Sequence, residues 1–257
     1  MAAETIILPA AVVFACVSVL WVISLRLRDA SIADIWWGPG FAVIAWVLVY
    51  QHNEPTDRLW AVTALLSIWA LRLGVYLGAR NIGHAEDKRY QAMRERAPGF
   101  WWVSLFQVFY LQGALQVLVA LPVFATVSLN SALGALDIFA AFVVLFGIGL
   151  EATADMQLAR FKLDSGSHSS VLRTGVWGWC RHPNYFGNAL IWLGIGLLAL
   201  AGGAGWWTLA GPAVMWFLLL KVSGVSMLES TIVDRRPEYR RYIEDVPAFF
   251  PNPFRRS

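Results

Sequence analysis

The sequence predicts an all-α integral membrane protein with seven transmembrane helices, an outer N-terminus and a cytoplasmic C-terminus. Three observations predict this fold class. Of the 257 residues, 58% are hydrophobic and only 14% are charged, whereas soluble globular chains carry about 25% charged residues. The apolar residues gather in runs of about 20, the length that spans the hydrocarbon core of a bilayer. Basic residues gather in alternate loops. These properties exclude a disordered protein, a disulfide scaffold and an ordinary water-soluble enzyme.

Seven apolar segments predict the helices in chain order. We place them at residues 6–25, 34–51, 59–80, 102–128, 134–158, 185–202 and 206–230. The first segment has no basic residue before it and no clear cleavage site after it, so we do not expect a cleaved signal peptide. Three glutamines, Gln107, Gln112 and Gln116, interrupt the fourth segment. No stretch between the segments is long enough for a separate soluble domain.

The distribution of lysine and arginine predicts the orientation. Basic residues follow the first, third, fifth and seventh segments, whereas Arg58 alone lies in a loop on the opposite side. Since cytoplasmic loops carry an excess of basic residues, the N-terminus is expected outside and the C-terminus in the cytoplasm. The same residues would also attract anionic lipids.

Charged residues inside the predicted helices indicate a buried polar ligand, because a charge at membrane depth is costly. On the third segment, three polar residues are spaced by four positions and therefore form a stripe along one helix face. They are Arg72, Tyr76 and Arg80. On the fifth segment, the residues that share a face within about 40° are Glu151, Asp155 and Lys162. The alternative is that Glu151 or Asp155 only pairs with an arginine to hold helices together.

The segment 175–187 contains an Arg-His-Pro-Asn-Tyr motif before the sixth predicted helix. Pro183 suits the first helical turn, where its missing N–H costs nothing. Free N–H groups at that helix start, with Arg181 and His182 just before it, would suit a phosphate. The alternative is a basic helix entry at the lipid headgroups.

Three motifs together resemble the steroid 5-alpha-reductase family, and more closely its bacterial branch of small membrane reductases formerly catalogued as a domain of unknown function. They are RHPNYFG (181–187), EATADMQLARFK (151–162) and PEYRRYIEDVPAFFP (237–251), and the likeness covers residues 30–255. RHPNY is shared with sterol reductases and with isoprenylcysteine carboxyl methyltransferases, but the Asp-x-Gln-x-x-x-Phe-Lys element points to the reductases. The resemblance implies a seven-helix enzyme of the bacterial inner membrane that binds NADPH and reduces a Δ4-3-keto steroid or a similar enone.

The resemblance also implies roles for individual residues. Arg72 would contact the cofactor, and Asp155 would hold its adenosine ribose. Lys162 would lie near its phosphates, Asn184 would bind the nicotinamide carboxamide, and Asp34 would orient the substrate carbonyl. The further cofactor-binding residues expected are Arg80, Glu151, Arg173, Arg181, His182, Tyr185, Lys221, Glu229 and Arg240. Residues 1–257 would form one polytopic domain, with residues 134–257 carrying most of this site.

Departures from the family pattern concern the substrate side. Trp69 stands where steroid-reducing members have a tyrosine, and Asn188 stands where many relatives have an acid. Lys221 and Glu229 replace an arginine and a tyrosine of the animal enzymes. The catalytic residues expected are therefore Asp34, Tyr76 and Trp69.

The expected reaction is hydride transfer from NADPH to the β-carbon of the enone. Asp34 would stabilise the developing enolate if it is protonated, or else orient a neighbouring donor. The candidate neighbours are Trp36, Trp37, Trp69 and Tyr76. The alternative role of Asp34 is a helix N-cap.

Two other functions stay open: a methyltransferase that uses S-adenosylmethionine on a lipidated thiol or a lipid headgroup, and a non-catalytic lipid-binding membrane protein. The sequence has no Gly-x-Gly-x-x-Gly motif, so a flavin is not indicated. The four histidines are scattered along the sequence, so no metal is expected. We expect a monomer that contacts membrane lipids, takes a hydrophobic substrate from the bilayer and binds no nucleic acid.

Overall fold

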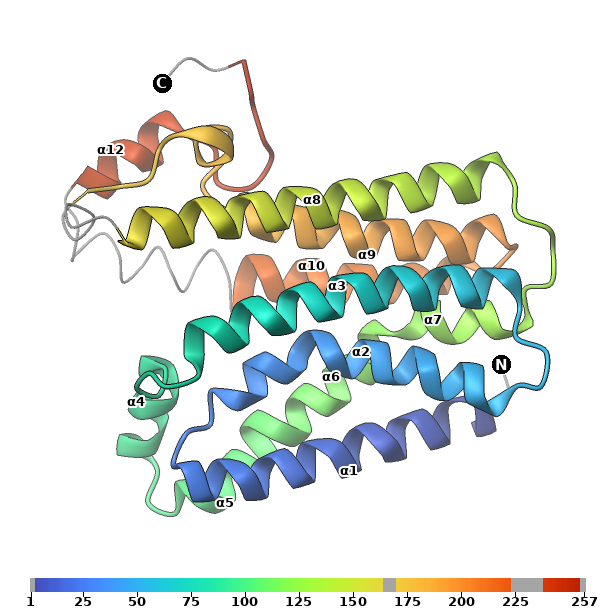
Figure 1. Ribbon diagram of the computed structural model, residues 1–257, viewed down its shortest axis with the longest axis horizontal. Coiled ribbons are helices and arrows are strands. Elements are labelled where there is room, and N and C mark those ends of the chain that lie inside the picture. The colour runs from blue at the N-terminus through green and yellow to red at the C-terminus, as the bar shows by residue number, and fades with distance from the viewer. Residues whose placement is uncertain (1–2, 164–169, 223–237, 255–257) are drawn as a thin grey trace. The chain divides into compact units, whose positions relative to one another are not determined.

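A computed structural model describes residues 3–163, 170–222 and 238–254 (Figure 1). Within these ranges the regular elements are all helices and no strand occurs, which confirms the predicted all-helical class. The chain divides into two compact units, which are described separately. The first comprises Met1–Gly134 with Leu198–Thr208, and the second comprises Ala135–Leu197 with Leu209–Ser257.

Three long helices begin the first unit: α1 (Ala3–Leu27), α2 (Ile32–Gln51) and α3 (Asp57–Asn81). Thr56 caps α3, since its side chain accepts from the backbone N–H of Leu59 at 3.0 Å. Helices α2 and α3 approach closely because Gly38 faces the backbone of Ala70. Phe41 and Trp69 are fully buried, and their rings pack at an angle of 46° with centroids 5.9 Å apart.

The fourth predicted segment, 102–128, is not one continuous helix. The chain forms α5 (Phe100–Ser104), the π-helix η1 (Leu105–Tyr110) and α6 (Leu111–Val119), followed by α7 (Leu121–Ala125) and the 3-10 helix η2 (Thr126–Ser128). The prediction of an unbroken helix to residue 128 is therefore wrong. Pro122, at the start of α7, has no N–H to continue the hydrogen-bond ladder.

A short helix in the loop after α3 was not predicted. Helix α4 (Lys88–Arg96) contains four basic residues and one acidic residue. Asp87 caps it by accepting from the backbone N–H of Arg89 at 2.9 Å, and Tyr90 is its buried residue. This helix positions the side chains that bind Asp34.

The second unit is built on two long helices, α8 (Ala135–Leu163) and α9 (Pro183–Ala201). The last turn of α9, from Leu198 on, belongs to the first unit. The two helices lie side by side (Figure 1), because Gly147 of α8 faces the backbone of Gly187. Shorter elements complete the described chain: η4 (Gly175–Gly178), η5 (Trp206–Leu209), α10 (Ala210–Phe217), the π-helix η6 (Leu218–Val222) and α12 (Glu238–Asp245). Helix α9 begins at Pro183, as predicted.

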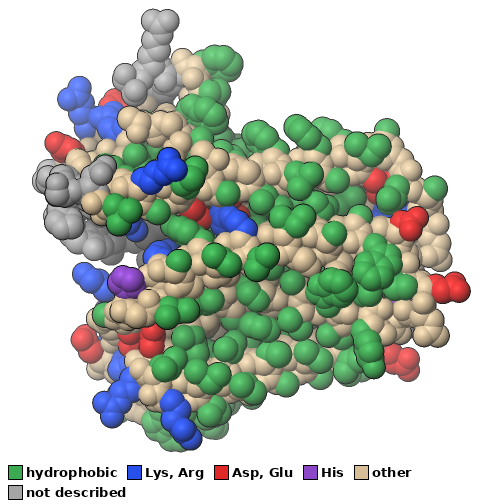
Figure 2. All heavy atoms as spheres, in the orientation of Figure 1, with side chains coloured by type: hydrophobic (Ala, Val, Ile, Leu, Met, Phe, Trp, Pro, Cys, Tyr) green, Lys and Arg blue, Asp and Glu red, His purple; other side chains and the backbone are tan. Residues whose placement is uncertain are grey.

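Six helical stretches in the described ranges are long and apolar enough to cross a membrane. They are Glu4–Leu27, Ile32–Gln51, Asp57–Asn81, Phe100–Val119, Ala135–Leu163 and Pro183–Ala201. Of the predicted seventh span, Trp206–Val222 is a shorter apolar stretch, and residues 223–230 lie outside the described residues. Figure 2 shows hydrophobic side chains spread over the long helices and charged ones gathered near helix ends. The chain is thus a membrane protein, whereas the count of seven and the orientation stay predictions.

Candidate functional site

Asp34 lies in the first turn of α2 and binds helix α4. Its Oδ2 accepts from Nη2 of Arg89 at 2.6 Å, and its Oδ1 accepts from the hydroxyl of Tyr90 at 2.7 Å. Ser31, not Asp34, occupies the N-cap position of α2, so the N-cap alternative for Asp34 is wrong. The expected neighbours were also wrong, because the partners of Asp34 come from α4 and not from the tryptophans or Tyr76.

The charges around Asp34 reinforce one another. Nε of Arg89 donates to Oδ1 of Asp87 at 2.9 Å, so two carboxylates hold one guanidinium. Burial opposes the charge of Arg89, but Asp34 and Asp87 outweigh it and raise the pKa of the guanidinium above its usual value. Burial also raises the pKa of Tyr90 well above its usual value, and Asp34 adds to that shift. Tyr90 therefore keeps its proton at neutral pH.

Further contacts fix α4 to the turn between α1 and α2. Glu86 accepts from the backbone N–H of Ala30 at 2.8 Å and pairs with Arg94 at 2.7 Å. Oγ of Ser31 accepts from the backbone N–H of Asp87 at 2.8 Å. The cluster of Asp34, Asp87, Arg89 and Tyr90, called the α4 cluster below, is thus held on a rigid support.

The predicted stripe on α3 exists. The guanidinium groups of Arg72 and Arg80 lie 5.9 and 6.0 Å from the ring centroid of Tyr76, so the three side chains share one face, as the spacing predicted. Two cations against one ring gain cation–π attraction. The expected catalytic Trp69 lies two turns before Tyr76 on the same helix and is fully buried, with its ring 5.9 Å from that of Phe41.

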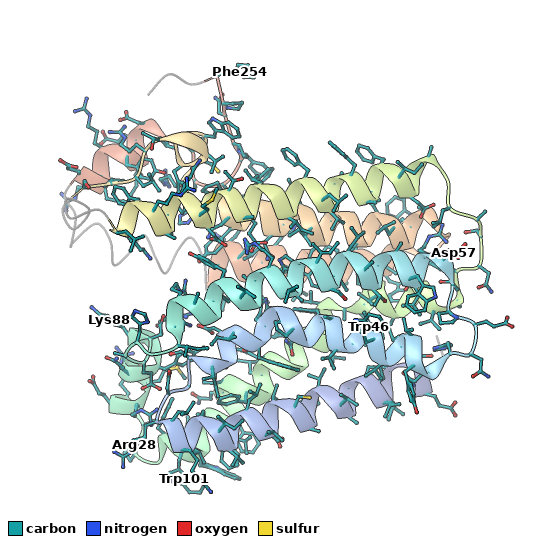
Figure 3. All side chains as sticks on the ribbon, viewed as in Figure 1. Arg28, Trp46, Asp57, Lys88, Trp101 and Phe254 are labelled. Carbon is teal, nitrogen blue, oxygen red and sulfur yellow. The ribbon has the colours of Figure 1, made fainter. Side chains whose placement is uncertain are left out.

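A groove of about 1000 Å³ lies between α2 and α3, lined almost entirely by apolar side chains. Its lining begins at Ile35, the residue after Asp34, and continues past Pro39 and Gly74 to Trp46. Trp46, labelled in Figure 3, donates from Nε1 to Oγ of Ser67 at 3.0 Å. The groove can hold the apolar part of a lipid-like molecule.

Two carboxylate–amide pairs connect α8 and α9 in the second unit. Asn184 donates from Nδ2 to Oδ1 of Asp155 at 3.3 Å, and Asn188 donates from Nδ2 to Oε1 of Glu151 at 3.4 Å. Both carboxylates are 5% exposed. The partners are spaced by four residues on each helix, so the pairs form two rungs, called the α8–α9 ladder below. Glu151 and Asp155 thus each have an amide partner on α9.

Glycines let the two helices approach closely enough for this ladder. A Cβ on Gly187 would lie 2.8 Å from the backbone nitrogen of Glu151, and a Cβ on Gly147 would lie 2.6 Å from the carbonyl oxygen of Gly187. Real Cβ atoms do not approach so closely, so any larger residue would force the helices apart. The glycine that ends the RHPNYFG motif therefore has a packing role.

Basic residues of the second unit divide into those bonded to the C-terminal segment and those exposed. Arg181 donates from Nη1 to the carbonyl oxygens of Ile243 and Val246, at 2.9 and 2.6 Å. Arg173 pairs with Asp245. These bonds hold the end of α12 against the Arg-His-Pro-Asn-Tyr segment. The basic side chains of the second unit that are exposed are those of Arg160, Lys162, Lys221, Arg240 and Arg241.

Two other expected cofactor residues lie beside this segment. His182 is buried, and its ring stacks on Tyr185 with centroids 5.5 Å apart and an interplanar angle of 3°. The backbone N–H of Tyr185 donates to Oδ1 of Asn184 at 3.0 Å. Glu229 lies outside the described residues. Within the described ranges, no group of three His, Cys, Asp or Glu side chains could hold a metal ion.

Sequence reasoning missed Tyr90 and the specific role of Arg89. Arg89 lies in the basic loop after the third predicted segment and was assigned no role of its own, and Tyr90 was not considered. A signal was present in the sequence. Asp87 is followed by nine mostly polar and charged residues, 88–96, and this pattern is typical of a capped surface helix. A single buried aromatic residue on such a helix marks the side that packs against the protein.

Comparisons with known proteins agree with a membrane protein of this kind. Residues 20–246 match the model of a family described as "Protein of unknown function (DUF1295)", which is related to steroid 5-alpha-reductase-like membrane proteins. An uncharacterized protein of Schizosaccharomyces pombe is 29% identical over 269 aligned positions, which cover 91% of this chain and 76% of that protein. No solved structure matches the chain.

Proposed function

Because the chain belongs to the DUF1295 family, we propose that it is a membrane reductase that uses NADPH to reduce the C=C bond of an enone lipid. The substrate class we favour is a Δ4-3-keto steroid, as the likeness to the steroid 5-alpha-reductases implies. We further propose seven membrane spans, an outer N-terminus and a location in a bacterial cytoplasmic membrane.

The observation that carries this proposal is the α8–α9 ladder. Buried carboxylates and amides are suited to the hydroxyls of a ribose and to a carboxamide. Oδ1 of Asn188 is buried and has no hydrogen-bond partner among the described residues, so the ladder offers an acceptor to an N–H or O–H group. Asp155, Asn184 and Asn188 therefore fit the polar parts of a dinucleotide.

Exposed cations of the second unit support the choice of a phosphorylated cofactor. Lys162 ends the same helix face as Glu151 and Asp155, and Arg240 lies on α12. Such side chains can pair with the phosphates of NADPH, including its 2′-phosphate. Arg181 and Arg173 instead contribute by holding α12 in place.

On the substrate side, the α4 cluster can stabilise charge on a carbonyl oxygen. When bound, NADPH supplies the hydride that reaches the β-carbon, and negative charge develops on the carbonyl oxygen as an enolate. Asp34 orients Arg89 and Tyr90, both of which carry N–H or O–H donors at neutral pH. Removal of one donor at such an oxygen commonly costs about 10²–10³ in rate. Because the single O–H proton of Tyr90 is donated to Asp34, the donors left for the carbonyl oxygen are the remaining N–H groups of Arg89.

The groove between α2 and α3 offers the substrate a path from the bilayer. Its walls are apolar and its lining begins beside the α4 cluster, at Ile35. A molecule with an apolar body and one ketone could place the body in the groove and the ketone toward Asp34. This arrangement suits a sterol-like enone that partitions into lipid.

The proposal is tested with purified protein in detergent. NADPH oxidation is measured against testosterone, progesterone and acyclic enones, with the saturated ketones as controls, and the products are identified by the gain of two hydrogens. An enone-dependent rate supports the proposal. If S-adenosylmethionine raises the melting temperature and NADPH does not, the chain is a methyltransferase instead.

A further inference from the structure

Two of the three glutamines in the fourth apolar segment are turned inward. Gln107, in the π-helix η1, is exposed, Gln112 is half-buried and Gln116 is fully buried. Gln112 and Gln116 are four residues apart on α6 and so lie on the same side of the helix. Neither of them takes part in the proposed function.

Gln116 is fixed against helix α2. Its Nε2 donates to the carbonyl oxygen of Trp37 at 2.9 Å and lies 3.4 Å from that of Trp36. Gly40 makes this contact possible, because a Cβ there would lie 2.2 Å from the same nitrogen. A large polar side chain is thus held inside an apolar unit by a glycine that leaves room for it.

Trp36 lies one turn before Gly40, on the face of α2 that Gln116 contacts. Three polar atoms on α2 and α6 have no hydrogen-bond partner among the described residues. They are Oε1 of Gln112, Oε1 of Gln116 and Nε1 of Trp36, and all three atoms are buried. A buried polar group without a partner loses its hydration and gains nothing in return, so such groups are rare in native proteins. The π-helix immediately before α6 is a second sign, since π-helical turns occur often at functional sites.

We propose that Trp36, Gln112 and Gln116 form a binding site, the α2–α6 polar site, for the O–H group of a neutral molecule. The two amide oxygens need a donor and the indole N–H needs an acceptor, and a hydroxyl supplies both. A ketone would serve only Trp36. The side chains are uncharged, so they favour a neutral occupant. The hydroxyl belongs either to a lipid alcohol, which reaches the site past the half-buried Gln112, or to a water molecule.

Thermal unfolding of the full-length protein in detergent tests the site without any turnover, so its result is independent of the proposed reaction. Gln112→Met keeps the side-chain length but removes the acceptor. We expect this variant to lower the melting temperature by roughly 2–4 °C, while Gln107→Met, the exposed control, leaves it unchanged. A melting temperature at or above that of the wild type would overturn the proposal, since an acceptor with no occupant is replaced by an apolar group at no cost.

Trp36→Phe provides the second measurement, because it keeps the aromatic ring and removes only the N–H donor. If one occupant joins the atoms, the double variant loses less stability than the sum of the single variants. Additive losses would show that Trp36 and Gln112 serve separate partners, which would overturn the shared site. If Gln112→Met does not fold, Trp36→Phe becomes the deciding variant, and we expect it to lower the melting temperature.

Two probes identify the source of the hydroxyl. If 1-octadecanol, but not octadecane, raises the melting temperature of the wild type and not of Gln112→Met, the occupant is a lipid alcohol. If neither probe acts while both variants lose stability, the occupant is water.

Discussion

Tyr90 donates a hydrogen bond to Asp34 over 2.7 Å, although 56 residues separate them in the sequence. Arg89, the residue before Tyr90, pairs with the other oxygen of the same carboxylate. One carboxyl at the start of α2 therefore fixes two neighbouring donors of α4. Any role of Asp34 in a reaction is exerted through the positions of these two donors.

Replacement of Asp34 by asparagine tests that role. Asp34→Asn keeps an oxygen that can accept from Tyr90 but loses the ion pair with Arg89. We expect unchanged NADPH affinity and a kcat about 10²-fold lower, which corresponds to about 2.7 kcal/mol of transition-state stabilisation. Steady-state NADPH oxidation with the best enone, together with a melting curve, measures both effects.

The matched control is Glu86→Gln, which weakens another contact of α4, the pair with Arg94, without touching Asp34. It should keep kcat near the wild-type value. If both variants lose turnover and melting temperature together, Asp34 only holds α4 in place. Wild-type turnover by Asp34→Asn on every reduced enone would remove it from the reaction.

The α8–α9 ladder should bind NADPH. Asp155→Ala and Asn184→Ala remove the two partners of one rung, so each should weaken NADPH binding at least tenfold, or about 1.4 kcal/mol, in a protein that stays folded. Thr153→Ala, on the same helix but outside the ladder, should bind as the wild type does. Isothermal titration in detergent measures the affinity, and unchanged values for both ladder variants would refute the site.

The cofactor should be NADPH and not NADH. The 2′-phosphate adds roughly two negative charges, and exposed cations such as Lys162 and Arg240 are available to pair with them. We expect kcat/KM to favour NADPH by at least tenfold, about 1.4 kcal/mol, and the preference to shrink as salt is added. Equal kcat and KM for the two cofactors would indicate that these cations serve the membrane surface.

The fold class follows from residue patterns because long apolar runs leave the chain few alternatives to helices in lipid. Six of the runs are helices long enough to cross a membrane, and Pro183 begins α9 as its chemistry requires. Helix α4 was missed because apolar runs were the signal sought, and a short charged helix has none. The break after Val119 depends on one proline, Pro122, inside an otherwise apolar stretch.

The sites were only partly predictable for a similar reason. A spacing of four residues correctly places Arg72, Tyr76 and Arg80 on one face, because helical periodicity is local. The partners of Asp34 depend on how a loop folds back over 56 residues, which no local pattern encodes. The same holds for Arg181, whose bonds to the end of α12 come from a distant segment.

Two glycines of α8 test whether close helix packing supports the ladder. A Cβ on Gly147 would lie 2.6 Å from the carbonyl oxygen of Gly187, whereas a Cβ on Gly149 would meet nothing within 4 Å. Gly147→Ala should therefore push α9 away, cost about 1–3 kcal/mol of stability and weaken the pair of Glu151 with Asn188. Gly149→Ala, two residues later in the same helix, should be neutral or stabilising by up to about 1 kcal/mol. Melting temperature and NADPH affinity are compared for both variants. Equal behaviour of the two would mean that α8 and α9 do not need the contact at Gly147.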